Sequence, residues 1–425
     1  MKSVKLKYGR HGLTISVPES VQVFSPVWEA AYDDETAAIL QALANPIGVR
    51  PLKEQLQPNM SVIIAHTDLT RATPNQLLLP PILAEIEEAG IPKRQVTLIN
   101  ALGSHRSQTE AEMYALLGDK ILSQYRCLQH DAFDLQVNTD IAKTVNGQSV
   151  KINRNFVEAD FRILTGFIEP HFFAGFSGGP KLILPGMAHI ETIQWNHRLE
   201  SIASDKATWG ITAGNPIWEE IRAVAKRFSP MFNVNVTLDE QQKINGVFCG
   251  DLFASHTAGC EFVREQSMFS TPNLFDMVIT GNSGYPLDQN LYQAIKGMCA
   301  AAEITRPGGS IIIVAACEDG LPDHGLYAQL LADADSPTQL LENILHGAKS
   351  LQDQWQVQKQ AAVQTRFEVS VYSDGLSDEQ IHKAHFEPIH SIEDEILALL
   401  KKNPQAHIAV LPEGPLSIGK FKSAK

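Results

Sequence analysis

The chain of 425 residues is longer than one hydrophobic core usually supports, so about two domains are expected. Its net charge of −13, without any run rich in lysine or arginine, excludes a nucleic-acid-binding surface, which needs clustered positive charge. No stretch of about 18 uncharged apolar residues predicts a membrane span, and no apolar core of a signal peptide follows the lysine-containing N-terminus, so a cytoplasmic protein is expected.

Short apolar runs that end in polar or glycine-containing turns alternate with helical patterns along the first part of the chain. This alternation predicts α/β architecture with largely parallel sheets, and the clearest strands are expected at residues 61–65, 96–101 and 161–165. Asp68, His105 and His171 each follow one of these strands, and Arg71 follows the first. Because ligands in such sheets bind beyond the carboxyl ends of the strands, these four side chains are expected to share a cleft.

A second group of strands is predicted further along the chain, at residues 276–280 and 310–315, with a helix at 290–305 between them. The residues 249–266 favour a connecting helix, and 270–273 favour a hinge. A last strand at 407–411 is predicted to return to the first domain. The overall prediction is therefore two domains, each with a largely parallel sheet flanked by helices and with the active site in the cleft between them. Residues 1–269 and 396–425 form the larger, cofactor-binding domain, and residues 270–395 form the smaller one.

Three glycines, Gly175, Gly178 and Gly179, precede Lys181 in the segment GFSGGPK. Glycines permit left-handed turns and close approach of a ligand to the backbone, so the segment favours either a structural turn or an anion cradle. It is not a Walker A loop, because Pro180 precedes the lysine and no Ser or Thr follows it. The G-x-G-x-x-G spacing of a dinucleotide-binding turn is also absent, and the spacing alone leaves both readings open.

Several histidines lie beside turn signals, among them His105, His171 and His197. Histidine carries protons near neutral pH and is a frequent metal ligand, although a single histidine is more often a hydrogen-bonded structural residue. No H-E-x-x-H helix groups these histidines. The five cysteines are scattered without a C-x-x-C pair, which favours packing residues over disulfides or a thiolate zinc site.

Two further segments carry polar side chains that suit an anionic ligand. In the predicted helix after residue 290, Lys296 follows Gln293 by three residues and Tyr292 by four, so the three side chains share a face that is either solvated or grips a carboxylate. In Asp68-Leu69-Thr70-Arg71, the arginine suits a carboxylate or phosphate, and a buried structural Asp/Arg pair is the alternative.

Taken together, these segments resemble the nickel-dependent lactate racemase family and its homologues acting on other 2-hydroxy acids, over nearly the whole chain. The resemblance rests on the following motifs: Asn45-Pro46-Ile47-Gly48, Asp68-Leu69-Thr70-Arg71, Gly103-Ser104-His105-Arg106, Glu169 to Gly179 with Lys181, Asn196-His197, and Tyr285-Pro286-Leu287-Asp288-Gln289. The histidine-to-lysine motif is the most specific of them.

The resemblance implies a cofactor, the nickel pincer nucleotide, which is a nickel complex of pyridinium-3-thioamide-5-thiocarboxylic acid mononucleotide. By resemblance, Lys181 tethers this cofactor covalently and His197 is the protein ligand of the nickel. His105 and His171 are the acid/base pair, one on each face of the substrate. The remaining implied residues bind the cofactor (Asp68, Thr70, Arg71, Gly178, Gly179) or the substrate (Arg71, Tyr292, Gln293, Lys296).

The implied reaction is inversion of C2 of a small 2-hydroxy acid by an isomerase, a racemase or epimerase. The C2 hydrogen is a very weak acid beside a carboxylate, so the family moves it as a hydride to the cofactor while a histidine takes the hydroxyl proton. Accessory proteins that make the cofactor are implied as partners in maturation. Ser104 and Pro180 depart from the lactate-specific pattern, and the smaller Ser104 predicts a pocket for a longer or more polar acid. The sequence names neither the acid nor the oligomeric state.

Two alternatives remain open on the residues alone. One is a histidine-based metallohydrolase that acts on an anionic substrate without an organic cofactor. The other is a non-catalytic binding homologue that never carries the cofactor.

Overall fold

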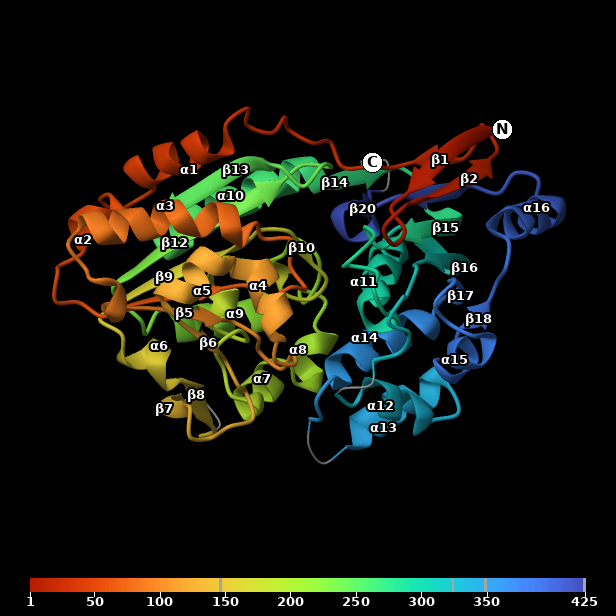
Figure 1. Ribbon diagram of the computed structural model, residues 1–425. Coiled ribbons are helices and arrows are strands. Elements are labelled where there is room, and N and C mark those ends of the chain that lie inside the picture. The colour runs from red at the N-terminus through yellow and green to blue at the C-terminus, as the bar shows by residue number, and fades with distance from the viewer. Residues whose placement is uncertain (145–146, 323–324, 348–349, 423–425) are drawn as a thin grey trace. The chain divides into compact units, whose positions relative to one another are not determined.

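A computed structural model describes residues 1–144, 147–322, 325–347 and 350–422 (Figure 1). The chain folds into two compact units, and each consists of segments that are distant in sequence. The first unit contains Trp28–His197 and Ser204–Arg264, and the second contains Met1–Val27, Arg198–Ala203 and Glu265–Lys425.

The first unit is built on a mixed sheet whose strands follow the order β13-β12-β9-β4-β5-β6. All neighbours are parallel except the pair β12 and β13. In chain order the strands are β4 (Val62–His66), β5 (Val96–Asn100), β6 (Arg126–Gln129), β9 (Phe161–Phe167), β12 (Met231–Leu238) and β13 (Ile244–Gly250). Every residue of β4 and β9 is buried, as expected for parallel strands that are covered on both faces.

Helices cover this sheet and bury its apolar side chains. They are α1 (Glu35–Ala44), α2 (Leu52–Gln55), α3 (Asn75–Glu88), α4 (Glu110–Leu117), α5 (Asp119–Gln124), α6 (Arg154–Glu158), α7 (Ile190–Asn196), α9 (Pro216–Ala225) and α10 (Leu252–Ser267), with short 3-10 turns η1 (Lys93–Gln95) and η2 (Gly179–Leu182). One continuous core joins the sheet to several of these helices. Ile64, Leu98 and Ile163 of the sheet belong to this core, and so do Leu79 and Ile86 of α3.

Two small hairpins complete the first unit. β7 (Asn138–Lys143) pairs with β8 (Ser149–Asn153), and β10 (Pro170–His171) pairs with β11 (Gly175–Phe176). The second hairpin follows β9 directly, so it carries the histidine-to-lysine segment to the carboxyl end of the sheet.

The second unit contains a fully parallel sheet in the order β18-β17-β16-β15-β19-β3. Its strands are β3 (Gln22–Val23), β15 (Phe275–Gly281), β16 (Thr305–Val314), β17 (Glu368–Tyr372), β18 (Glu387–Pro388) and β19 (Ile408–Leu411). The hairpin of β1 (Lys2–Leu6) and β2 (Leu13–Val17) packs with α16 (Ile392–Lys402) over one face, where Leu6, Ile279 and Ile396 share a core.

On the same unit, α11 (Leu291–Ala302) packs against β15, β16 and α14 (Gln354–Gln364). The Asn290 side chain accepts the Gln293 amide and so fixes the start of α11. The other elements of the unit are α8 (Leu199–Ala203), β14 (Met268–Thr271), α12 (Tyr327–Ala332), α13 (Pro337–His346), α15 (Asp378–Lys383), η3 (Gly414–Leu416) and β20 (Ile418–Phe421). β14 and β20 pair in parallel.

The predicted α/β class and the largely parallel sheets are confirmed, and the six predicted strands correspond to β4, β5, β9, β15, β16 and β19. The predicted helix at 290–305 is α11. The connector helix starts at Leu252, because Cys249 and Gly250 still pair with β12 as the end of β13. Two residues of the predicted hinge, Ser270 and Thr271, pair with β20.

The division into compact units differs from the predicted boundaries at both ends of the chain. The sequence assigns residues 407–411 to the first domain, whereas β19 hydrogen-bonds to β15 in the second unit. β3 in turn pairs with β19, and this pairing brings Met1–Val27 into the second unit as well. Strand pairing over so long a sequence separation leaves no local signal in the sequence.

Candidate active site

The predicted site residues of the first unit follow neighbouring strands. β9, β4 and β5 are adjacent in the sheet and parallel, so their carboxyl ends lie at one edge. Asp68 follows β4, His105 follows β5, and His171 follows β9. This edge is where α/β sheets bind ligands, because the loops after the strands converge there.

Asp68 and His105 form a hydrogen-bonded pair. The Asp68 Oδ2 atom lies 2.6 Å from His105 Nδ1, and Asp68 is only 3% exposed. Burial alone would raise the pKa of Asp68, but His105, Arg71 and Thr70 lower it to about 2. The carboxylate is therefore ionised near neutral pH and can only accept, so His105 carries its hydrogen on Nδ1. Its Nε2 is then the basic nitrogen, as in a carboxylate-oriented general base.

The loop after β4 is held by its own polar side chains. Thr70 donates to Asp68 Oδ1 from its hydroxyl at 2.7 Å and from its backbone amide at 3.2 Å. Arg71 donates to the Thr70 carbonyl at 3.1 Å, and its Nε lies 3.6 Å from Glu169 Oε1. Ser177 in turn donates to Glu169 Oε1 at 3.2 Å. These contacts connect the Asp68 loop to the segment that carries His171, and Arg71 thus has a structural ion pair with Glu169 rather than with Asp68.

His171 holds the opposite tautomer from His105. The backbone amides of Phe173 and Ala174 donate to His171 Nδ1 at 3.4 and 3.2 Å, so the neutral ring carries its hydrogen on Nε2. The residue is buried, at 6% exposed. In this state His105 presents a basic nitrogen, whereas His171 presents a hydrogen-bond donor.

Three predicted site residues, His171, His197 and Lys181, lie around the ring of Phe173. Its centroid lies 4.4 Å from the His171 ring, 5.0 Å from the His197 ring and 5.6 Å from Lys181 Nζ. His171, Lys181 and His197 are 26 residues apart in sequence at most, so the fold and not the spacing brings them together. Phe173 belongs to the motif used above, but no sequence signal distinguishes it from Phe172.

His197 has the protonation state that a metal ligand requires. Its Nδ1 donates to the Ile193 carbonyl at 3.0 Å, which places the ring lone pair on Nε2. Burial and the nearby charge of Lys181 lower its pKa to about 3, so the ring is neutral at physiological pH. This arrangement fits a buried imidazole that binds a metal through Nε2.

The glycines before Lys181 are required by close packing. Gly178 and Gly179 have φ angles of 77° and 51°, which side-chain-bearing residues rarely adopt. A Cβ atom would lie 2.8 Å from Asn235 Oδ1 at Gly178 and 2.4 Å from the His256 ring at Gly179. The Gly179 amide donates to Asn235 Oδ1 at 2.7 Å. Both glycines are therefore needed for the structure of the turn, and their contact with a cofactor stays a prediction.

The predicted carboxylate-binding residues lie together on α11 of the second unit. Lys296 Nζ donates to Gln293 Oε1 at 2.6 Å, which confirms that the two side chains share a helix face. Trp355 on α14 donates from Nε1 to the Tyr292 hydroxyl at 3.3 Å, and Gln356 donates to the Tyr292 carbonyl. Sequence reasoning missed Trp355 and Gln356, because α14 shows no amphipathic pattern that marks its contacts.

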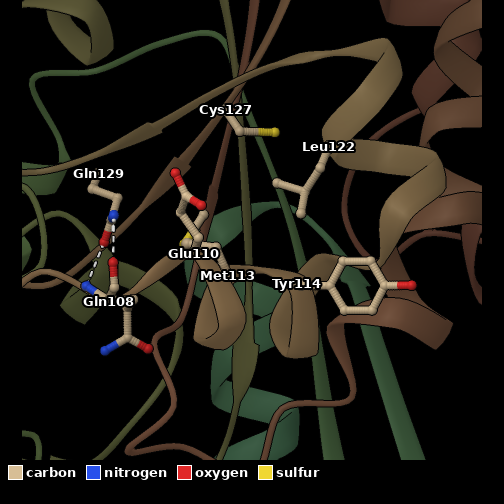
Figure 2. Close-up of a pocket in the computed structure, with 7 residues that line it drawn as sticks. All are labelled: Gln108, Glu110, Met113, Tyr114, Leu122, Cys127 and Gln129. Carbon is tan, nitrogen blue, oxygen red and sulfur yellow. Dashed lines mark hydrogen bonds between the residues drawn. The ribbon is translucent and has the colours of Figure 1, made fainter.

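A surface pocket of about 410 Å³ lies on the first unit and is shown in Figure 2. Its walls contain none of the predicted site residues; they are Gln108, Glu110, Met113, Tyr114, Leu122, Cys127 and Gln129. Gln129 is hydrogen-bonded twice to the Gln108 backbone, at 2.7 and 2.9 Å, and Gln108 Oε1 accepts the Leu69 amide. One wall of the pocket thus supports the Asp68 loop, but the polar side chains of that loop do not line the pocket.

Within the described residues, no group of three His, Cys, Asp or Glu side chains is arranged to hold a metal ion. The described part of the chain also has no helix long and apolar enough to cross a membrane. All five cysteines are free, and four of them are buried.

The fold and these side chains define an α/β protein with a carboxylate-oriented histidine, a second histidine of opposite tautomer and a half-buried lysine. The lactate racemase N-terminal domain family matches residues 8–210, and the lactate racemase C-terminal domain family matches residues 271–418. The chain therefore belongs to the lactate racemase family and is an isomerase, a racemase.

Individual relatives agree with this assignment. The lactate racemase of Lactiplantibacillus plantarum is 35% identical over 422 residues, covering 97% of this chain and 99% of the relative. That of Thermoanaerobacterium thermosaccharolyticum is 34% identical over 421 residues, covering 97% and 98%. The apoprotein structure of a lactate racemase from T. thermosaccharolyticum superposes with a TM-score of 0.92 at 32% identity, over 99% of this chain and 100% of that one. A Thermotoga maritima protein shares the fold, with a TM-score of 0.69 at 18% identity, over 93% and 100% of the two chains.

Proposed function

We propose that this racemase inverts C2 of a small 2-hydroxy acid by proton-coupled hydride transfer, with a nickel pincer nucleotide tethered to Lys181. The observation that carries the proposal is the arrangement around Phe173, where Lys181, His171 and His197 meet on one ring. The relatives named above are lactate racemases, which supports lactate or a close analogue as the substrate. The half-buried Ser104 before His105 keeps a larger 2-hydroxy acid as an alternative.

Proton transfer from the substrate hydroxyl falls to His105. Its Nε2 accepts the proton, and the ionised Asp68 at 2.6 Å from Nδ1 stabilises the imidazolium that forms. The same pair returns the proton when the hydroxyl is restored. Because the Asp68 carboxylate is already fixed by Thr70, little reorganisation accompanies the transfer.

His171 is not equivalent to His105 in this state. Its Nε2–H can donate a hydrogen bond to a substrate oxygen on the other face. To act as the base for the opposite enantiomer, His171 has to carry its hydrogen on Nδ1, which requires loss of the Phe173 and Ala174 amide contacts. The two histidines therefore hold different tautomers as long as these contacts persist, and only His105 has a lone pair on Nε2.

The residues present fit the proposed cofactor. Lys181 offers a primary amine for a covalent thioamide, and it lies against the same Phe173 ring as His197. His197 offers an Nε2 lone pair for nickel while Ile193 holds its other nitrogen. When bound at Lys181 and His197, the nickel pincer nucleotide would supply a reversible acceptor for the C2 hydride.

The carboxylate of the substrate is proposed to bind Gln293 and Lys296. Lys296 supplies a positive charge and Gln293 an amide, and the 2.6 Å contact between them pre-orders the two side chains. Tyr292, held by Trp355, is proposed to contact the substrate as well. The roles of Asp68, Thr70 and Arg71 toward the cofactor also stay proposals, as do maturation by accessory proteins and a cytoplasmic location.

The test is maturation of the full chain by coexpression with cofactor-making proteins, followed by intact mass, nickel content and assays of single enantiomers. We expect one covalent adduct per chain, stoichiometric nickel, inversion of C2, and a primary isotope effect with C2-deuterated substrate. Lys181→Arg keeps the charge but lacks the amine that forms a thioamide, so it should carry no adduct and show no activity. Racemisation at the normal rate by Lys181→Ala would refute the proposal, and so would hydrolysis by a zinc-bound, adduct-free chain.

A further inference from the structure

His256 on α10 lies directly beneath the turn that precedes Lys181. Its Nε2 is 2.8 Å from the Ser177 carbonyl oxygen, which can only accept, so Nε2 carries the ring hydrogen. Gly179 packs against the same side chain, where a Cβ atom would lie 2.4 Å from His256 Cδ2 and 2.7 Å from Cγ. His256 thus contacts the turn both by a hydrogen bond and by packing.

Two neighbours fix the orientation of the His256 ring. The ring stacks on Trp218, with centroids 5.1 Å apart and planes inclined by 20°. Cys260, one helical turn further along α10, has its Sγ 3.4 Å from His256 Nδ1 and 3.7 Å from Nε2, so the sulfur lies over the ring. Burial raises the pKa of the Cys260 thiol well above its ordinary value, so the thiol stays protonated and uncharged. The ring is therefore held by Trp218 and Cys260 while its Nε2 donates to the Ser177 carbonyl.

Hydrogen bonds fix the backbone between the turn that His256 contacts and Lys181. The Lys181 amide donates to the Gly178 carbonyl at 3.2 Å, and the Gly179 amide donates to Asn235 Oδ1 at 2.7 Å. Asn235 is fully buried and His256 is 1% exposed, so both supports are rigid parts of the core. The backbone from Ser177 to Lys181 is therefore held from two sides, by β12 and by α10.

His256 is also kept neutral. Burial lowers its pKa, and although the Ser177 bond opposes this, the nearby Lys181 charge lowers it further, to about 4. Near neutral pH the ring is therefore uncharged, and its one N–H is the one that donates to the Ser177 carbonyl.

We infer that His256 is a positioning residue that sets the direction of the Lys181 side chain, through its hydrogen bond to Ser177 and its contact with Gly179. The inference rests on the proposed covalent role of Lys181. His256 itself is not proposed to contact the cofactor or the substrate, so it acts only through the turn.

The variants His256→Phe and His256→Gln separate the two contacts. Phenylalanine keeps a ring for stacking on Trp218 but loses the donor, while glutamine places its Nε2 at a similar distance from Cα and keeps the donor. After maturation of the full chain, we expect the fraction of chains with the Lys181 adduct to fall at least about tenfold in His256→Phe and to stay within about threefold of wild type in His256→Gln.

A second readout needs no cofactor. Brief acetylation of the apo chain with acetic anhydride, read by peptide mass spectrometry, gives the reactivity of Lys181 relative to the other lysines. We expect His256→Phe to change this ratio at least about threefold and His256→Gln to restore it. The other lysines also show whether a variant is folded, because global unfolding changes their ratios together.

Equal adduct fractions and equal Lys181 reactivity in wild type and His256→Phe would overturn the inference. So would a His256→Gln variant as defective as His256→Phe, because the hydrogen bond would then not be the cause. If wild type carries no adduct at all, the proposed function fails, while the acetylation ratios still decide whether His256 positions Lys181.

Discussion

Replacing Asp68 by asparagine tests the proposed base most directly, because the change is nearly isosteric. Thr70 donates two hydrogen bonds to Asp68 Oδ1, so an asparagine at this position should place its carbonyl oxygen there. Its amide nitrogen, a donor, then faces His105 Nδ1 in place of the carboxylate oxygen at 2.6 Å. His105 has to accept at Nδ1 and carry its hydrogen on Nε2, which removes the base from the substrate side.

The expected loss in kcat is about 10³- to 10⁴-fold, the size found when a histidine base in another enzyme is forced into the wrong tautomer. That factor corresponds to roughly 4 to 5 kcal/mol of transition-state stabilisation. KM should change much less, because neither Asp68 nor His105 is proposed to hold the substrate carboxylate.

The same substitution has a consequence for stability. The Asp68 pKa is lowered from 3.8 to about 2 in the folded chain, a difference that amounts to roughly 2 kcal/mol of stabilisation. Since the folded pKa is the lower one, this stabilisation is fully present above about pH 4 and is lost as the pH falls toward 2. Asp68→Asn should therefore be less stable than wild type by about 2 kcal/mol near neutral pH, and the two curves should converge in acid.

The assay is initial-rate racemisation of a single enantiomer by matured protein with equal adduct content, together with urea unfolding between pH 3 and pH 7. Thr70→Val is the matched control, because it removes one donor to Asp68 but keeps the carboxylate beside His105; its kcat should fall by less than about tenfold. A kcat for Asp68→Asn within about threefold of wild type would refute the tautomer argument. A stability difference between Asp68→Asn and wild type that persists unchanged at pH 3 would refute the argument that the lowered pKa of Asp68 stabilises the fold.

Three further outcomes follow from other contacts. Gly179→Ala should unfold at lower urea concentration, by about 1 to 3 kcal/mol, because its Cβ would lie 2.4 Å from the His256 ring at a φ of 51°; unchanged stability would contradict the packing described here. His197→Ala should lose nickel, measured by metal analysis, while intact mass still detects the organic adduct on Lys181; full nickel occupancy would remove His197 from its proposed role. Lys296→Met should raise KM for a 2-hydroxy acid at least about tenfold with adduct content unchanged, and a normal KM would show that Lys296 does not bind the carboxylate.

Much of the site could be predicted because its residues lie in motifs next to strands that local sequence already defines. The apolar runs of β4, β5 and β9 identify the strands, and the positions of Asp68, His105 and His171 follow from them. Gln293 and Lys296 share a helix face for the same local reason, three residues apart on α11.

The sequence by itself determined the α/β class, the principal strands and the motif residues, because these depend on patterns within a few residues of one another. Only the tertiary structure decided that β19 joins β15, that Asp68 orients His105 while backbone amides orient His171, and that Phe173 collects Lys181 and His197. It also decided that His256, 75 residues after Lys181, supports the turn before that lysine. Hydrogen-bond partners and packing neighbours of this kind come from distant parts of the chain, and their geometry, unlike helix or strand periodicity, leaves no trace in the local order of residues.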